Sequence, residues 1–240
     1  GSLSWSSDRS KITYSARTPS DKGNEVYYVE AGKYKTPLRV TDDDASNVSP
    51  KFSNDARFII YAKNANGNYD IYKFETGSGK NTNISNNTAN DMSPAVSPDG
   101  TEVFFLSDES EKGKYDLYSM NMDGGNRTKL TNGLNIEPDS IRISPDSSMI
   151  AFVTKGEKGS KAIQVIDMNK SAVLISNGGY LASWSSDSKS LYFAASDKDS
   201  RKLGKYDITG RKTKDALKVQ IKPGEEAEGI KFIHFTDKLK

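Results

Sequence analysis

The stretch MSPAVSPDGTEVFFLSD, residues 92–108, contains a short apolar run, a Ser-Pro-Asp-Gly turn and an alternating run rich in aromatic residues. Proline presets the backbone of such a turn, the Asp carboxylate accepts from backbone N–H groups two residues on, and glycine adopts positive φ at no steric cost. The flanking residues have the composition of strands. The stretch therefore predicts a β-hairpin centred on Asp99.

The same pattern occurs five times along the chain. Each copy has an Asp in the turn, a bulky apolar residue at position −3, Ser at −2, an aliphatic residue at +4 and an aromatic residue at +6. The turn aspartates, spaced by 41 to 47 residues, are Asp8, Asp55, Asp99, Asp146 and Asp187. Positions +4 and +6 share one face of a strand because successive side chains alternate. Every copy therefore predicts a strand with a buried apolar face.

Further strands are expected in each copy. Around Asp99 they are KYDLYSMN (114–121) and TKLTN (128–132). Four short strands in about 44 residues are typical of one blade of a β-propeller. No helical periodicity persists over an 11-residue window, which excludes a helical solenoid. We therefore predict an all-β fold, a β-propeller of four-stranded antiparallel blades.

We favour five blades, with a six-bladed ring whose last blade is incomplete as the alternative. Residues 3–240 are expected to form a single propeller domain, and Gly1-Ser2 resembles a cloning scar, so any targeting segment would lie outside this sequence. The tail 221–240 contains the strand-like GIKFIHF but breaks the repeat pattern. We expect it to form an extra closing or edge strand, since an open ring leaves strand edges unpaired.

Composition limits the chemistry open to the chain. Its 240 residues have a net charge of +2, no cysteine and one histidine, His234. The small net charge disfavours nucleic acid as a partner, and the missing thiols exclude disulfides and cysteine metal sites. No apolar run approaches the ~18 residues of a membrane span. We predict no cofactor, no nucleic-acid partner and no membrane span.

No catalytic or metal-binding motif emerges from the sequence. A Ser-His-Asp triad would need His234, and a GxSxG elbow is absent. The turn aspartates are expected to cap their turns. TDDDASN (41–47) and NANGNYD (64–70) contain clustered oxygen ligands, but they lack the glycine spacing and final Glu of an EF-hand. We therefore predict a protein that is not an enzyme and has neither catalytic nor metal-binding residues.

The repeat SPAVSPDGTEVFFLSDESEKGKYDLYSMNMDGGNRTKLTN (93–132) resembles that of TolB-like β-propellers, which are related to the propellers of prolyl oligopeptidase and dipeptidyl peptidase type proteins. The resemblance covers residues 3–220 in all five copies. It implies a propeller that binds protein partners in the bacterial envelope. The resemblance also implies that, in the peptidase relatives, catalytic activity belongs to a separate α/β-hydrolase domain.

The candidate binding site lies at the mouth of the central channel. The segments leading into the innermost strands, DDASNVS (43–49), TANDMS (88–93), LNIEPDS (134–140) and NGGYLAS (177–183), differ between copies while the framework positions persist. Loops that vary on a fixed scaffold are where binding usually resides. The candidate partner-binding residues are Asn47, Asp91, Glu137, Asp139 and Tyr180.

Three functions remain open at this stage. The favoured one is a noncatalytic extracytoplasmic interaction domain, in the periplasm or at the surface of a bacterium, that binds a protein or cell-envelope polysaccharide through one propeller face. It is expected to be a monomeric domain of a larger protein. The alternatives are a small-ligand or carbohydrate sensor that uses the channel mouth, and the gating propeller of a larger hydrolase.

Overall fold

The computed structural model describes residues 3–30, 32, 36–65, 67–167, 172–197, 200–210 and 212–219, and these form five four-stranded antiparallel sheets. The prediction of an all-β fold is confirmed. The tail 221–240 and the dipeptide Gly1-Ser2 lie outside the described residues.

Each sheet is formed by four strands in chain order, the first of them innermost. The first two sheets contain β1 (Leu3–Trp5), β2 (Lys11–Ala16), β3 (Glu25–Glu30), β4 (Leu38–Arg39), β5 (Ser46–Phe52), β6 (Phe58–Asn64), β7 (Tyr69–Glu75) and β8 (Asn81–Asn83). The third contains β9 (Asp91–Val96), β10 (Glu102–Glu111), β11 (Lys114–Asn121) and β12 (Thr128–Lys129). The last two contain β13 (Arg142–Ile143), β14 (Met149–Lys155), β15 (Lys161–Asp167), β16 (Ala172–Asn177), β17 (Gly179–Trp184), β18 (Ser190–Asp197), β19 (Ser200–Asp207) and β20 (Lys212–Val219).

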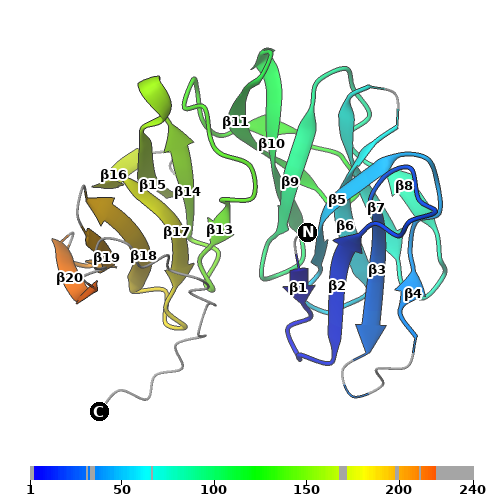
Figure 1. Cartoon of the computed structure of the whole chain (residues 1–240), viewed down its shortest axis with the longest axis horizontal. Coiled ribbons are helices and arrows are strands. Elements are labelled where there is room, and N and C mark those ends of the chain that lie inside the picture. The colour runs from blue at the N-terminus through cyan, green and yellow to red at the C-terminus, as the bar shows by residue number, and fades with distance from the viewer. Residues whose placement is uncertain are drawn as a thin grey trace.

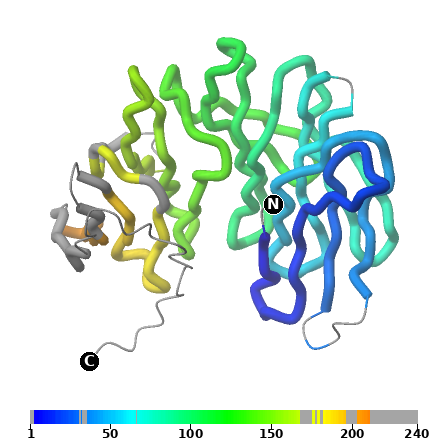
Figure 2. Tube along the Cα trace, in the orientation of Figure 1, coloured from blue at the N-terminus to red at the C-terminus, as the bar shows by residue number. Residues whose placement is uncertain are grey.

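The five sheets follow one another along an arc, with β1–β4 at one end and β17–β20 at the other (Figure 1). The described part of the chain passes through them in sequence order, as the colour gradient in Figure 2 shows. Innermost strands of neighbouring sheets contact each other, for example β1 with β5 and β5 with β9. Within the described residues, the only helical element is a short 3₁₀ turn at Glu157–Gly159, and no helix is long and apolar enough to cross a membrane.

Four hydrophobic clusters join consecutive sheets, and they follow one rule. The face that carries the +4 and +6 residues packs against the preceding sheet. Thus Val103 and Phe105 of the third sheet pack against Ile60 and Ile71 of the second. In copies two to five these framework residues are at most 3% exposed; they are Ile59, Tyr61, Val103, Phe105, Ile150, Phe152, Leu191 and Phe193. The predicted buried face of each of these strands is confirmed.

The five hairpin turns share one hydrogen-bond pattern. In the third copy, Ser97 Oγ donates to Asp99 Oδ1 at 2.6 Å and accepts from the backbone N–H of Glu102 at 2.9 Å. The serine hydroxyl also donates to the turn aspartate, at 2.6 to 2.7 Å, in the pairs Ser6–Asp8, Ser53–Asp55, Ser144–Asp146 and Ser185–Asp187. The turn aspartates therefore cap their turns, as predicted, because each carboxylate accepts from the serine and from backbone N–H groups.

This pattern lowers the pKa of every turn aspartate. At Asp8 the hydrogen bond from Ser6 is the largest cause, and the pKa falls to about 2. The Ser97 hydroxyl is likewise the main cause at Asp99. At Asp146 burial by itself would raise the pKa, but the hydrogen bonds from Ser144 and its neighbours outweigh it. The charged carboxylates are therefore part of the folded framework.

We expect the free energy of unfolding to fall as the pH drops from about 4 toward about 2. A carboxyl whose folded pKa lies below its unfolded value of about 3.9 stabilises the fold above that value. This contribution is lost as the pH falls through the folded pKa. Urea unfolding across this range measures the effect. In the control, Asp99→Asn with Asp146→Asn, each amide oxygen can still accept from the serine but no longer titrates; a pH dependence equal to that of the unaltered chain would contradict the prediction.

Candidate functional site

Carboxylates at the start of the third strands hold the segments that lead into the next sheet. Asp116, at 3% exposure, accepts from Thr131 Oγ1 at 3.0 Å and from the backbone N–H of Gly133 at 3.0 Å. The equivalent hydroxyl-to-carboxylate hydrogen bonds join Thr41 to Glu25 and Ser85 to Asp70. These hydrogen bonds take the place of hydrogen bonds to water, which the polar groups lose when they are removed from solvent. The rim segments are therefore fixed in place by the strands behind them.

Three rim residues from three different sheets meet at the centre of the arc. Ser49 Oγ of β5 donates to Asp139 Oδ1 at 2.7 Å, and the Asp139 backbone N–H donates to Ser93 Oγ of β9 at 2.9 Å. All three residues have φ between 54° and 60°, a left-handed conformation that non-glycine side chains seldom adopt. Because the second and fourth sheets are not neighbours, this Ser49–Asp139–Ser93 junction can form only on the inner side of the arc.

Two cations flank the junction. Lys51 and Arg142 occupy position −4 of their repeats, and Asp139 is the acid whose charge acts on both. Burial lowers the pKa of both side chains, and Asp139 opposes this effect. Arg142 Nη1 donates to the carbonyl oxygens of Asp139 at 3.0 Å and Ile141 at 2.8 Å. Within the described residues Lys51 Nζ has no hydrogen-bond acceptor or ion-pair partner, so its donors remain available for a ligand.

Asn47 lies inside the protein, behind the rim. Its side chain is 0% exposed, and Nδ2 donates to Asp43 Oδ1 at 3.1 Å and Glu25 Oε2 at 3.3 Å. Its Oδ1 has no hydrogen-bond partner among the described residues. The Asn47 side chain thus joins the first and second sheets and does not reach the surface.

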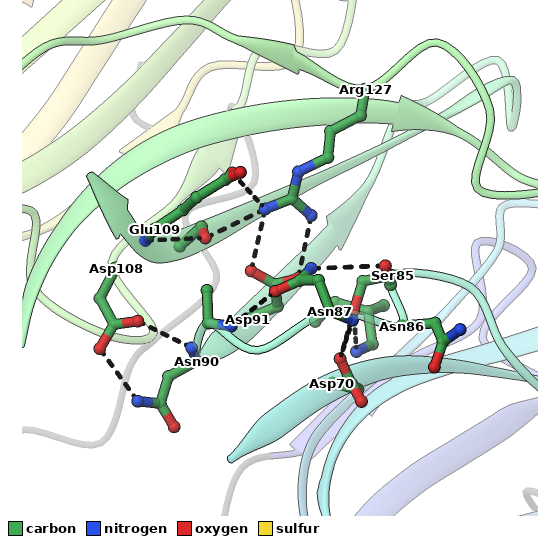
Figure 3. A network of polar contacts seen from close by, with 12 residues as sticks. Asp70, Ser85, Asn86, Asn87, Asn90, Asp91, Asp108, Glu109 and Arg127 are labelled. Carbon is green, nitrogen blue, oxygen red and sulfur yellow. Dashed lines mark hydrogen bonds and ion pairs between the residues drawn. The ribbon is translucent and has the colours of Figure 1, made fainter. Parts of the chain in front are cut away.

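Asp91 is also 0% exposed and forms part of a network between the second and third sheets (Figure 3). Its two oxygens accept from Arg127 Nη1 at 2.9 Å and Nη2 at 3.2 Å, and Asn87 Nδ2 donates to it at 2.6 Å. Arg127 also contacts Glu109 and lies over the ring of Phe105. All these partners belong to the protein, so Asp91 holds the rim from within.

Glu137 and Tyr180 are the remaining candidates. Glu137 pairs with Lys161, the first residue of β15, at 2.7 Å. Tyr180 belongs to β17, and its side chain is outside what the structure describes. Of the four predicted binding residues whose side chains the structure describes, only Asp139 lies in the central junction.

Sequence reasoning missed Lys51, Arg142 and the two junction serines. Position −4 holds Ser4, Lys51, Ala95, Arg142 and Ser183 in the five copies, so it varies in both charge and size. Position −4 directly precedes position −3, which is apolar in all five copies. Its side chain therefore lies on the opposite face of the innermost strand. This variation beside a constant framework position was the available signal. Among the described residues, no group of three or more His, Asp or Glu side chains is arranged to hold a metal ion.

Comparison with known proteins identifies related sequences. A family model described as the TolB beta propeller domain matches residues 2–227. The Tol-Pal system protein TolB of Francisella tularensis subsp. tularensis (strain WY96-3418) is 39% identical over 66 residues. The aligned part is 28% of this chain and 15% of that protein, so the chain matches only a small share of the relative's length.

Solved structures share the fold. TolB from Acinetobacter baumannii superposes with a TM-score of 0.69 at 20% identity, over 89% of this chain and 53% of that chain. A prolyl endopeptidase superposes with a TM-score of 0.71 at 12% identity, over 92% of this chain and 35% of that chain. At these identities the likeness shows the fold alone. It confirms the predicted propeller architecture and both branches of the predicted resemblance.

Proposed function

Because this chain belongs to the TolB β-propeller domain family, we propose that it is a noncatalytic interaction domain that binds a protein partner at the channel mouth. The observation that carries the proposal is the cluster of Lys51, Arg142 and Asp139 from the second and fourth sheets. Its cations retain unused donors, and a rigid junction fixes the loops around them. Preorganised groups of this kind bind at a lower entropic cost than mobile ones.

The charge of the cluster favours an acidic group on the partner. Lys51 and Arg142 contribute two positive charges and Asp139 one negative charge. A carboxylate at the end or on a side chain of an extended segment would pair with the cations, while Asp139 and Ser49 would meet backbone N–H groups. Charge-assisted hydrogen bonds of this kind are stronger than neutral ones. We propose an extracytoplasmic location for this domain, the compartment that its resemblance to TolB-like propellers implies.

A small-ligand sensor is the weaker proposal. The structure contains a hollow of about 210 Å³ between the first three sheets, lined by Trp5, Phe52, Val96 and Pro98. Ligand pockets usually measure about 300 to 1,000 Å³. The hollow lies at the turn end of the innermost strands, beside the residues at −3. Its size and position favour packing over ligand capture.

We expect Lys51→Ala with Arg142→Ala to weaken capture of the partner at least about tenfold, equivalent to roughly 1.4 kcal/mol. The immobilised chain is incubated with a bacterial envelope extract, and captured proteins are quantified by mass spectrometry across a dilution series. Lys22→Ala with Lys114→Ala is the matched control, since both of these lysines are exposed and lie outside the channel.

If a protein is captured equally by the unaltered chain and by both variants, the proposal that it binds at the channel mouth is wrong. Turnover of peptide, ester or glycoside substrates that disappears on a single side-chain change would reject the noncatalytic part of the proposal.

A further inference from the structure

Lys51 differs from other partly buried lysines of the sheets because its ammonium group is unpaired. Lys63 Nζ forms an ion pair with Asp43 at 2.6 Å, and Lys73 Nζ donates to the carbonyl oxygen of Met122 at 2.8 Å. Lys51 is partly buried as well, but among the described residues its Nζ has neither an acceptor nor a counter-ion. Removing a charged group from water without a partner is costly. The Lys51 amine is therefore a candidate for chemistry of its own.

A β-bulge fixes the backbone that carries Lys51. The register of β5 against β6 shifts between Val48 and Lys51, and Ser49 within this interval has a φ of 54°. Bulges change the direction of side chains and are frequent beside functional sites. The Ser49 hydroxyl donates to Asp139 Oδ1 at 2.7 Å. The bulge and this hydrogen bond together hold Lys51 at one place on the inner side of the arc.

A second cation lies close to the Lys51 amine. Burial is the main cause of the lowered pKa of Lys51, the charge of Arg142 adds to it, and Asp139 opposes both. Within the described part of the chain, the Asp139 carboxylate forms no ion pair with either cation. Only a neutral amine has a lone pair for attack on carbon, and lysines are activated by desolvation or by a neighbouring cation. Lys51 has both kinds of neighbourhood.

Arg142 adds a group that binds carboxylates. Its Nη1 donates to the carbonyl oxygens of Asp139 at 3.0 Å and Ile141 at 2.8 Å. Nη2 and Nε have no acceptor among the residues that the structure describes. The planar guanidinium matches the two oxygens of a carboxylate. Because Lys51 and Arg142 are cationic and Asp139 is the one acid beside them, a single carboxylate would balance the charge of the cluster.

The other innermost strands place no long side chain in the same ring of positions. At position −4 the remaining copies have Ser4, Ala95 and Ser183, which are small and uncharged. A small guest of this cluster would carry one carboxylate for Arg142 and, directly beside it, a carbon that an amine can attack. An α-keto acid has this arrangement, since its carbonyl carbon is bonded to its carboxylate carbon.

We propose that Lys51 is a site of reversible covalent capture for α-keto acids. The carboxylate of the keto acid pairs with Arg142, and the adjacent carbonyl carbon is thereby placed at Lys51 Nζ. The nitrogen lone pair forms the C–N bond while the carbonyl π electrons move to the oxygen. The resulting carbinolamine loses this oxygen as water and becomes a protonated imine.

The reaction balances without an oxidant or a reductant. Of the three protons on the Lys51 ammonium group, two leave with the oxygen as water and one stays on the imine nitrogen. The Asp139 carboxylate is the group of the cluster that can carry these protons. Capture is a modification of the chain and involves no turnover, and the proposal does not depend on which protein binds at the channel mouth.

Reductive trapping with pyruvate tests the proposal. The full chain is incubated with pyruvate at neutral pH, and cyanoborohydride adds hydride to the imine carbon, which leaves a stable carboxyethyl group on the lysine. Peptide mass mapping over time gives the rate at each lysine. We expect Lys51 to react at least about tenfold faster than Lys22 and Lys114, equal to roughly 1.4 kcal/mol in activation free energy. Both controls are exposed and paired with a carboxylate. Equal rates at the three lysines would overturn the proposal.

Acetaldehyde, which lacks a carboxylate, tests the choice of keto acid. The ratio of the pyruvate rate to the acetaldehyde rate should be larger at Lys51 than at Lys22 in the unaltered chain. Arg142→Lys keeps the positive charge but loses the planar pair of donors, so this ratio should fall at Lys51. An equal ratio at Lys51 and Lys22 would overturn the proposal whether or not the variant folds. So would a ratio that Arg142→Lys leaves unchanged while the circular dichroism matches that of the unaltered chain.

Discussion

Truncation of Phe105 to Ala is expected to lower the free energy of unfolding by about 3 to 5 kcal/mol, the usual range for a buried Phe. Phe105 is 0% exposed, packs between the second and third sheets and carries Arg127 over its ring. The substitution removes contacts on both sides of the inter-sheet core and leaves a cavity that the rigid sheets cannot fill. Phe152→Ala, at the same repeat position between the third and fourth sheets, should have an effect of similar size.

Urea unfolding monitored by circular dichroism measures both variants. Leu38→Ala is the control, because Leu38 is an apolar residue of comparable size that is mostly exposed on β4. It should change the stability by less than about 0.5 kcal/mol. If Phe105→Ala unfolds at the same urea concentration as the Leu38 variant, the assignment of the +6 position to the inter-sheet core is wrong.

Asp91→Ala is expected to destabilise the chain by about 3 kcal/mol. The substitution removes the carboxylate that accepts two hydrogen bonds from Arg127 in a largely desolvated site. Removing one partner of a buried ion pair costs about 3 to 5 kcal/mol. Arg127 retains some contact with solvent and with Glu109, which places the expectation at the lower end of that range. Thermal unfolding at neutral pH measures the change.

A double-mutant cycle separates the pair from its surroundings. Asp91→Ala, Arg127→Met and the combined variant are compared, and the combined variant should be more stable than the sum of the two single changes predicts. Glu109→Ala is the control, since this carboxylate contacts the same guanidinium but is 54% exposed. Equal losses for Asp91→Ala and Glu109→Ala would show that burial does not determine the strength of this contact.

Local sequence patterns establish the repeat, and the repeat establishes the fold. The turn chemistry of Ser97 and Asp99, and the alternation through Val103 and Phe105, depend on neighbours within about ten residues. Local rules of this kind describe hydrogen bonds and strand faces without knowledge of the rest of the chain. Five copies of one local pattern then predicted five four-stranded sheets.

The candidate site could be predicted only in part. LNIEPDS (134–140) precedes its innermost strand, β13, whereas DDASNVS (43–49) and TANDMS (88–93) extend into β5 and β9, and NGGYLAS (177–183) lies largely within β17. Asp139 belongs to the central junction. Asn47 and Asp91 stand at the corresponding position of neighbouring copies, yet both are buried. Glu25 of β3 and the loop residues Asp43 and Arg127 enclose them. A polar residue in a variable loop has the same sequence signal whether it faces the channel or a neighbouring sheet.

Which side chains share the channel depends on how the sheets are arranged in space. Lys51 and Asp139 are 88 positions apart, and they meet because two sheets separated by a third curve around one centre. Ile12 and Tyr14 are only partly buried, unlike Val103 and Phe105, because no sheet precedes theirs among the described residues. The repeat pattern contains only what the five copies have in common. The burial and the charge pairing of a side chain depend on which sheet packs beside it.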